Sequence, residues 1–96
     1  MNLLVAYDIC TDSKRGEKRL RRVSKICINF GQRVQKSVYE CQLSEEELVE
    51  FVHMLSEVVH PTEDNIRIYR VSGVAQGSVV NLGRAVGMDY SNPMII

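Results

Sequence analysis

The sequence lacks several features on which whole classes of protein depend. Its three cysteines, Cys10, Cys27 and Cys41, form no C-x-x-C pair, which argues against a disulfide framework or a zinc site and favours a reducing compartment. No apolar run approaches the ~20 residues that a membrane helix needs. The opening MNLLVAYD is too short, and too soon charged, for a secretory signal. We therefore expect a cytoplasmic protein with no membrane contact.

Several catalytic arrangements are also missing. There is no phosphate-binding glycine loop, and neither His53 nor His60 has a neighbour that suggests a catalytic pair. Ser37 has no base at a readable spacing, so a serine nucleophile is not indicated.

The length of the chain and the distribution of its charges indicate a single domain with two oppositely charged segments. The 96 residues suffice for one domain, predicted to span 1–96, whose core is thin enough for oligomerisation to add useful burial. The net charge is zero, but residues 14–36 are rich in Lys and Arg with Glu17 as the sole acid, whereas residues 40–64 carry acids and no Lys or Arg. These segments are either two solvated helix faces, or a basic face for phosphate and an acidic face for a partner or for keeping phosphate away.

The first half of the chain predicts a strand, a helix and more strand. Residues 3–9 are apolar on both alternate faces except at Asp8, which suits a strand in the middle of a sheet. Thr11-Asp12-Ser13 then starts a helix that Gly31 ends. Its apolar stripe recurs at spacings of three and four: Leu20, Val23, Cys27 and Phe30. Residues 32–41 have strand composition, as two short strands or one bent strand.

The second half begins with a complete helix signal. Ser44 and Glu47 form a capping box, and the helix that follows is expected to end before Pro61. Residues 66–71, IRIYRV, read as another strand. The order is that of a ferredoxin-like α+β sandwich, βαββαβ, with both helices on one sheet face. Because 3–9 is apolar on both sides, we expect a homodimer packed through the open sheet faces, with the tail at 73–96 adding an extension strand to the dimer.

Asp8 is the one acid within this apolar first strand. A buried carboxylate is costly unless it is paired, hydrogen-bonded or metal-bound. A structural interpretation has Asp8 capping the following helix or pairing with one of its arginines. A functional interpretation makes Asp8 a catalytic ligand of Mg²⁺, for which Mn²⁺ could substitute, with the second Asp8 supplied across a two-fold axis. Such a metal would hold a phosphate and acidify a bound water.

The basic helix beside Asp8 suits a phosphate backbone, because arginine forks match phosphate oxygens. Arg33, at the start of the next strand, is a further candidate. Tyr7 and Tyr39 either stack on bases or serve as packing residues. The helix cations expected to grip phosphates are Lys14, Arg15, Lys18, Arg19 and Arg22.

Three stretches together resemble a known family. VAYDI at 5–9, GQRVQKSVYEC at 31–41 and NIRIYRV at 65–71, with the basic helix between the first two, are similar to the CRISPR-associated protein two family. The resemblance implies a ferredoxin-like homodimer that joins the CRISPR-associated protein one integrase in spacer acquisition, as a scaffold for the inserted DNA. It also implies metal-dependent nuclease activity on single-stranded RNA or double-stranded DNA.

The family's functional residues are carried over position by position. Its metal-site aspartate falls on Asp8, and the adjacent aromatic on Tyr7. The family's helix arginines fall on Arg19 or Arg21, and on Arg22. The R-V-Q arginine falls on Arg33 and the strand aromatic, often Phe in the family, on Tyr39. The helix and the RIYR strand resemble the subgroup that cuts duplex DNA.

Two functions of different classes follow. The first is a Mg²⁺-dependent endonuclease with Asp8 from both subunits at the metal. The second is a non-catalytic scaffold that binds duplex DNA and the integrase, with Asp8 structural. A toxin-like RNase of the same fold is a third alternative.

Overall fold

Strands and helices follow one another in the predicted βαββαβ order. The structure, a computed structural model, describes residues 1–71 and 82. Its elements are β1 (Asn2–Asp8), α1 (Lys14–Phe30), β2 (Gly31–Gln35), β3 (Val38–Gln42), α2 (Glu45–Ser56) and β4 (Asn65–Arg70). The tail at 73–96, expected to add a strand to a dimer, lies outside the described residues except for Leu82.

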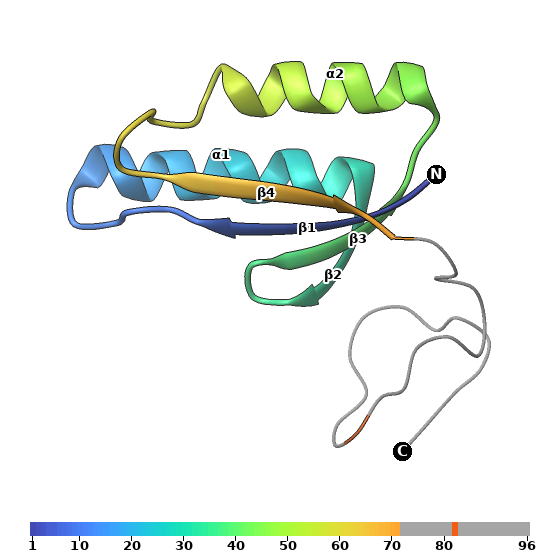
Figure 1. Cartoon of the computed structure of the whole chain (residues 1–96). Helices are drawn as coiled ribbons and strands as arrows, with labels where there is room; N and C mark the ends of the chain where they lie inside the picture. Colours follow the sequence, from blue (N-terminus) through green and yellow to red (C-terminus); the bar gives the residue numbers. More distant parts are fainter. Residues whose placement is uncertain (72–81, 83–96) are drawn as a thin grey trace.

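The sheet has the order β2-β3-β1-β4, and every neighbouring pair is antiparallel. Central β1 pairs with β3 on one side and β4 on the other, so that Val5 lies opposite both Tyr39 and Ile68. Figure 1 shows α1 and α2 on the same side of this sheet. The ferredoxin-like prediction is confirmed.

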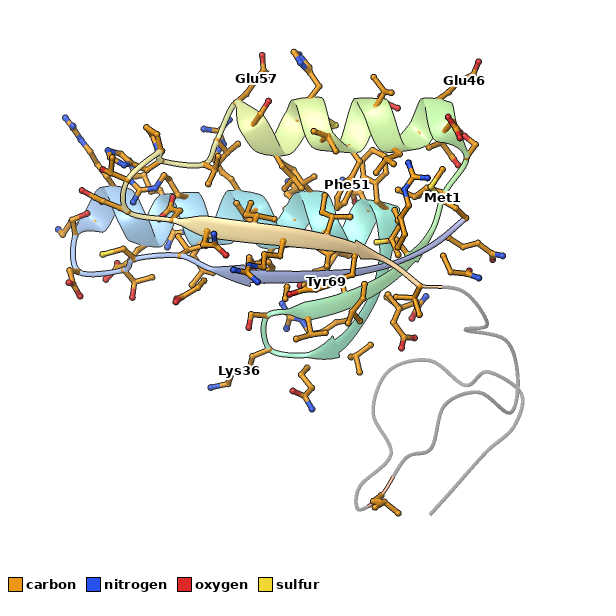
Figure 2. All side chains as sticks on the ribbon, in the orientation of Figure 1. Met1, Lys36, Glu46, Phe51, Glu57 and Tyr69 are labelled. Carbon is orange, nitrogen blue, oxygen red and sulfur yellow. The ribbon has the colours of Figure 1, made fainter. Side chains whose placement is uncertain are left out.

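The core lies between the helices and the sheet. Alternate residues of β1, Leu3, Val5 and Tyr7, are buried beneath the helices, as the period of two in a strand requires. The two helices meet through the rings of Phe30 and Phe51, whose centroids are 4.9 Å apart. In Figure 2, Phe51 points from α2 toward the sheet, whereas Glu46 and Glu57 project away from it. The described residues leave the opposite sheet face open.

Residues 32–41 form two strands rather than one bent strand. Lys36 and Ser37 make the turn between β2 and β3. Gly31 follows α1 as expected, but its φ of −162° is extended, so it is not a left-handed cap. It is needed for space, since a Cβ there would collide with the Cys41 sulfur and the Glu40 carbonyl oxygen.

The helix starts match their sequence signals. The Ser13 hydroxyl accepts from the Gly16 N–H, and Ser44 and Glu47 form the reciprocal capping box. The end of α2 is earlier than expected. The N–H of Val58 turns to the Leu55 carbonyl three residues back, so the regular helix stops at Ser56. In the part of the chain that is described, neither helix has the length and apolar character to cross a membrane.

Candidate metal and nucleic-acid site

Asp8 ends β1 with its side chain in solvent. The side chains of Leu3, Val5 and Tyr7 point toward the helices. Asp8 has the opposite orientation in the strand and points to the open sheet face, where it is paired with Asn65 of β4. In the single chain Asp8 is exposed rather than enclosed, because the strand ends there and nothing described covers that face. No desolvation cost therefore has to be met by a partner.

Neither structural alternative for Asp8 holds. The cap of α1 is Ser13, and the α1 arginine that pairs with acids, Arg19, contacts Glu63 and Asp64 instead. Over residues 1–71 the Asp8 carboxylate has no hydrogen-bond or ion-pair partner. Its oxygens are consequently available to a cation or to water.

This donor set fits part of a Mg²⁺ site. Mg²⁺ commonly takes one or two carboxylates and completes its octahedron with waters and substrate phosphates. No group of three His, Cys, Asp or Glu side chains gathers anywhere in the described residues. One chain therefore offers the single carboxylate of Asp8, and a second carboxylate has to come from elsewhere.

The solvent side of α1 is cationic. A loop of five residues, 9–13, joins β1 to α1, so the helix starts at the same end of the sheet as Asp8 (Figure 1). Its exposed cations have no ion-pair partner among the described residues; they are Lys14, Arg15, Lys18, Arg21, Arg22 and Lys25. Arg15, Lys18, Arg22 and Lys25 follow spacings of three and four, which place them along one face; we call these four residues the α1 stripe.

Arg19 does not belong to that surface. Its Nε donates to Asp64 Oδ2 at 2.7 Å, and its Nη2 donates to Asp64 Oδ1 at 3.3 Å and to Glu63 at 3.0 Å. The side chain is 13% exposed. The prediction that Arg19 grips phosphate is wrong for this structure, because a carboxylate pair already occupies the guanidinium.

Asp64 is the carboxylate that the sequence did not indicate. Its side chain is completely buried, and it accepts backbone N–H groups from Cys10 at 3.1 Å and His60 at 2.8 Å. Burial alone would raise its pKa, but the bonds from Arg19, His60 and Cys10 outweigh burial and hold that pKa below its usual value. Nothing local marks Asp64, since Arg19 lies 45 positions away along the chain.

Tyr7 and Tyr39 are core residues. Their rings stack at 5.9 Å, and Tyr39 has no exposed surface. The hydroxyl groups of Tyr7 and Ser24 share a hydrogen bond of 2.7 Å. Burial and the adjacent Tyr39 raise the pKa of Tyr7 to about 12, against the effect of the Ser24 bond. Base stacking was the wrong interpretation for both tyrosines, and packing is the role that the structure gives them.

Arg33 joins this aromatic pair to the surface. It is exposed on β2 and donates from Nε and Nη2 to the Tyr39 hydroxyl at 3.0 and 2.8 Å. These two bonds use Nε and Nη2, and they hold the exposed guanidinium against the Tyr39 ring. Arg33 stays a candidate phosphate ligand held in a fixed orientation by Tyr39.

Comparison with known proteins connects these features to a family. The family described as CRISPR associated protein Cas2 matches residues 1–79. The chain is 36% identical, over all of both chains, to "CRISPR-associated endoribonuclease Cas2 1" of Moorella thermoacetica. It is 38% identical to "CRISPR-associated endonuclease Cas2" of Halalkalibacterium halodurans, over 99% of each chain.

Solved structures agree with this match. The crystal structure of Streptococcus pyogenes Cas2 superposes with a TM-score of 0.77 at 42% identity, covering 86% of this chain and all of the other. A hypothetical protein from Thermus thermophilus superposes with a TM-score of 0.73 at 32% identity, covering 88% and 93%.

Proposed function

This chain belongs to the CRISPR associated protein Cas2 family, and on that premise we propose that it is a Mg²⁺-dependent endonuclease that cleaves phosphodiester bonds, with duplex DNA as the favoured substrate. The relatives' names, endoribonuclease and endonuclease, support a nuclease role. The observation that carries the proposal is Asp8: an exposed carboxylate without a partner, at the end of the sheet where the cationic helix begins.

Each residue then has a definite task. Asp8 holds the metal, which when bound would neutralise phosphate charge and acidify a water. Mn²⁺, with similar oxygen preference, would substitute. The α1 stripe holds the phosphates on either side of the scissile bond, and Lys14 adds to it near Asp8. Arg33 adds a positive charge whose position is fixed by Tyr39.

A second copy of the chain completes the site. The open sheet face carries Leu4, Ala6, Val38 and Tyr69 together with Asp8, by the strand register. Tyr69 is 46% exposed there, on a face that a monomer would leave to water. Packing two such faces about a two-fold axis would bury these apolar groups and bring a second Asp8 to the interface.

The preference for duplex DNA rests on the shape of the α1 stripe. The helix has 17 residues, so at about 1.5 Å per residue it is roughly 25 Å long. Straight, regularly spaced cations on a rigid rod match the regular phosphates of a duplex. Single-stranded RNA is the alternative substrate, and Tyr7 and Tyr39 offer it no stacking surface because both rings are buried.

One observation favours a second function. Because each described chain brings one carboxylate and a long cationic stripe, the same surface would also serve a protein that binds duplex DNA without cutting it. In that case the chain is a scaffold between DNA and the CRISPR-associated protein one integrase during spacer acquisition. The acidic outer face of α2, which includes Glu46 and Glu57 (Figure 2), would then meet the protein partner rather than DNA.

The two functions are separated by the variant Asp8→Asn. It preserves shape and removes the charge, so cleavage with Mg²⁺ should fall at least a hundredfold while duplex binding in EDTA stays unchanged. The matched control is Asp12→Asn, the same change at an exposed residue in the following loop, which should cleave like the parent. Equal cleavage by the Asp8→Asn protein would contradict Asp8 as the catalytic metal ligand, and absence of cleavage by the parent would leave the scaffold as the function.

A further inference from the structure

The loop that follows Asp8 is attached to a buried ion pair. Asp64 Oδ1 accepts the backbone N–H of Cys10, two residues beyond Asp8. Both Asp64 oxygens also accept from the Arg19 guanidinium, at 2.7 and 3.3 Å. We propose that the Arg19–Asp64 pair is a positioning device that sets the direction of the Asp8 carboxylate; this inference rests on the proposed function of Asp8.

The pair joins three separate segments at one point. Arg19 comes from the second turn of α1, Asp64 from the residue before β4, and Cys10 from the β1–α1 loop. Asp64 also accepts the N–H of His60, which holds the turn after α2. The Asp64 side chain has no solvent exposure, so water does not compete for these bonds, and bidentate charge-assisted bonds are among the stiffer ones in proteins.

The Cys10 peptide is held from its other side as well. A Cβ on Gly16 would collide with the Cys10 carbonyl oxygen, so glycine lets α1 approach that peptide closely. The N–H of Cys10 is therefore bonded to Asp64, and its carbonyl oxygen packs closely against Gly16 in the first turn of α1. With both groups constrained, the backbone two residues away at Asp8 has little freedom to turn.

Asp64 fixes the opposite strand too. Its next neighbour, Asn65, lies directly across from Asp8 in the β1–β4 ladder. The strand alternation sends Asp64 inward and leaves Asn65 exposed beside Asp8 on the open face. One buried carboxylate thus anchors both strand ends on which the candidate metal ligand depends, and ligand sites lose function when such supporting groups are loose.

Asp64→Ala tests this role in the full-length protein. Manganese binding, followed by electron paramagnetic resonance with Mn²⁺ alone, should weaken about tenfold or more, the usual range for supporting residues. Amide exchange at Cys10 should accelerate, and kcat should fall with little change in KM, because the α1 stripe is intact. Glu63→Gln is the matched control. Glu63 also pairs with Arg19, but on the surface and without contact to Cys10, so all three quantities should keep their parent values.

Arg19→Lys provides a second test in case the Asp64→Ala protein does not fold. It keeps the charge but cannot make two parallel bonds, so a several-fold loss of Mn²⁺ affinity is expected. If folded Asp64→Ala keeps the Mn²⁺ affinity of the parent, the ion pair has a structural role only. If Asp64→Ala does not fold, the same conclusion follows from an unchanged Mn²⁺ affinity of Arg19→Lys. Failure of the proposed function has a different signature: Asp8→Asn itself would then bind Mn²⁺ and cleave as the parent does.

Discussion

At the scale of single residues, two aspartates at the same end of the sheet have opposite surroundings. Asp8 is exposed and unpartnered, whereas Asp64 is buried beneath bonds from Arg19, Cys10 and His60. Burial without partners would neutralise a carboxylate, and full pairing would leave no oxygen for a metal. Of these two aspartates, Asp8 combines charge with oxygens that are open to solvent, and Asp64 is the one that can hold the chain in place.

Tyr7 provides a prediction at this scale. Replacing it with Phe deletes the hydroxyl that bonds Ser24, which should lower the free energy of unfolding near neutral pH by about 1 kcal/mol. Nucleic-acid binding should not change, because the ring is buried. Urea unfolding and a binding isotherm on the same samples measure the two quantities, and weaker binding by a protein of normal stability would contradict the packing role.

The same variant has a defined pH dependence. The pKa of Tyr7 is about 12 in the fold and about 10 in an unfolded chain. The contribution of the protonated Tyr7 hydroxyl to the free energy of unfolding is therefore fully present below pH 10 and is lost as the pH rises toward 12. The stability advantage of the parent over Tyr7→Phe should therefore disappear and reverse over that interval, because the rise in pKa from 10 to about 12 outweighs the ~1 kcal/mol of the hydroxyl bond. Burial also raises the pKa values of the Cys27 and Cys41 thiols, which both proteins carry.

The sequence was a good guide to residues whose role is local. Asp8 stood out as an acid in an apolar strand, and the exposed cations of α1 followed from its apolar stripe. Arg19 could not be told from Arg22 by pattern, because its role depends on Asp64, which is 45 positions distant. Exposure of Asp8 and burial of Tyr39 likewise depend on which side of β1 the helices cover.

At the scale of elements, helix starts were predictable and helix ends less so. Ser13 and the Ser44–Glu47 box are short-range signals, and both helices begin where these residues place them. Proline at 61 marks where a helix cannot continue, but α2 had already ended at Ser56 in a tighter turn. Gly31 follows the end of α1, as predicted. Glycine is needed there because β3 approaches closely, and not because the backbone takes a conformation that only glycine adopts.

The α1 stripe yields a prediction at this scale. Lys18→Gln with Arg22→Gln removes two of its four charges without touching Arg19. Each lost phosphate contact should lower the slope of log K against log salt by about 0.9 for a duplex, so the slope should fall by roughly 2. The control pair, Lys36→Gln with Arg70→Gln, makes the same charge change away from α1 and should leave the slope nearly unaltered. Equal slopes for both pairs would mean that α1 is merely solvated.

At the scale of the whole molecule, the open sheet face is a surface that none of the described elements covers. In the described chain it places Leu4 between Glu40 and Tyr69, with no helix above it. Leu4, Ala6, Val38 and Tyr69 form an apolar patch among polar residues of the same face, such as Glu40 and Arg67, and a second layer would cover that patch. The proposed two-fold packing of this face would provide that layer and the second Asp8 together.

Leu4→Lys tests the association directly. The lysine lies opposite Glu40 in the ladder, so the monomer should tolerate it, whereas a dry interface between two sheets should not. Sedimentation at micromolar concentration should show a monomer, and the far-ultraviolet spectrum should be unchanged. Val49→Lys, the same kind of change on the exposed side of α2, should remain a dimer. A dimeric Leu4→Lys protein would move the interface elsewhere.

The most direct test of a metal site shared by two copies is the activity of mixed dimers. Parent and Asp8→Asn chains, unfolded and refolded together in equal amounts, form parent, mixed and variant dimers at random. If one cleavage site needs both Asp8 carboxylates, only the parent dimers cut, and activity falls to about one quarter. Mixtures with Asp12→Asn should keep full activity. A mixture that retains about half of the activity would show that each chain acts alone, and would contradict the shared site.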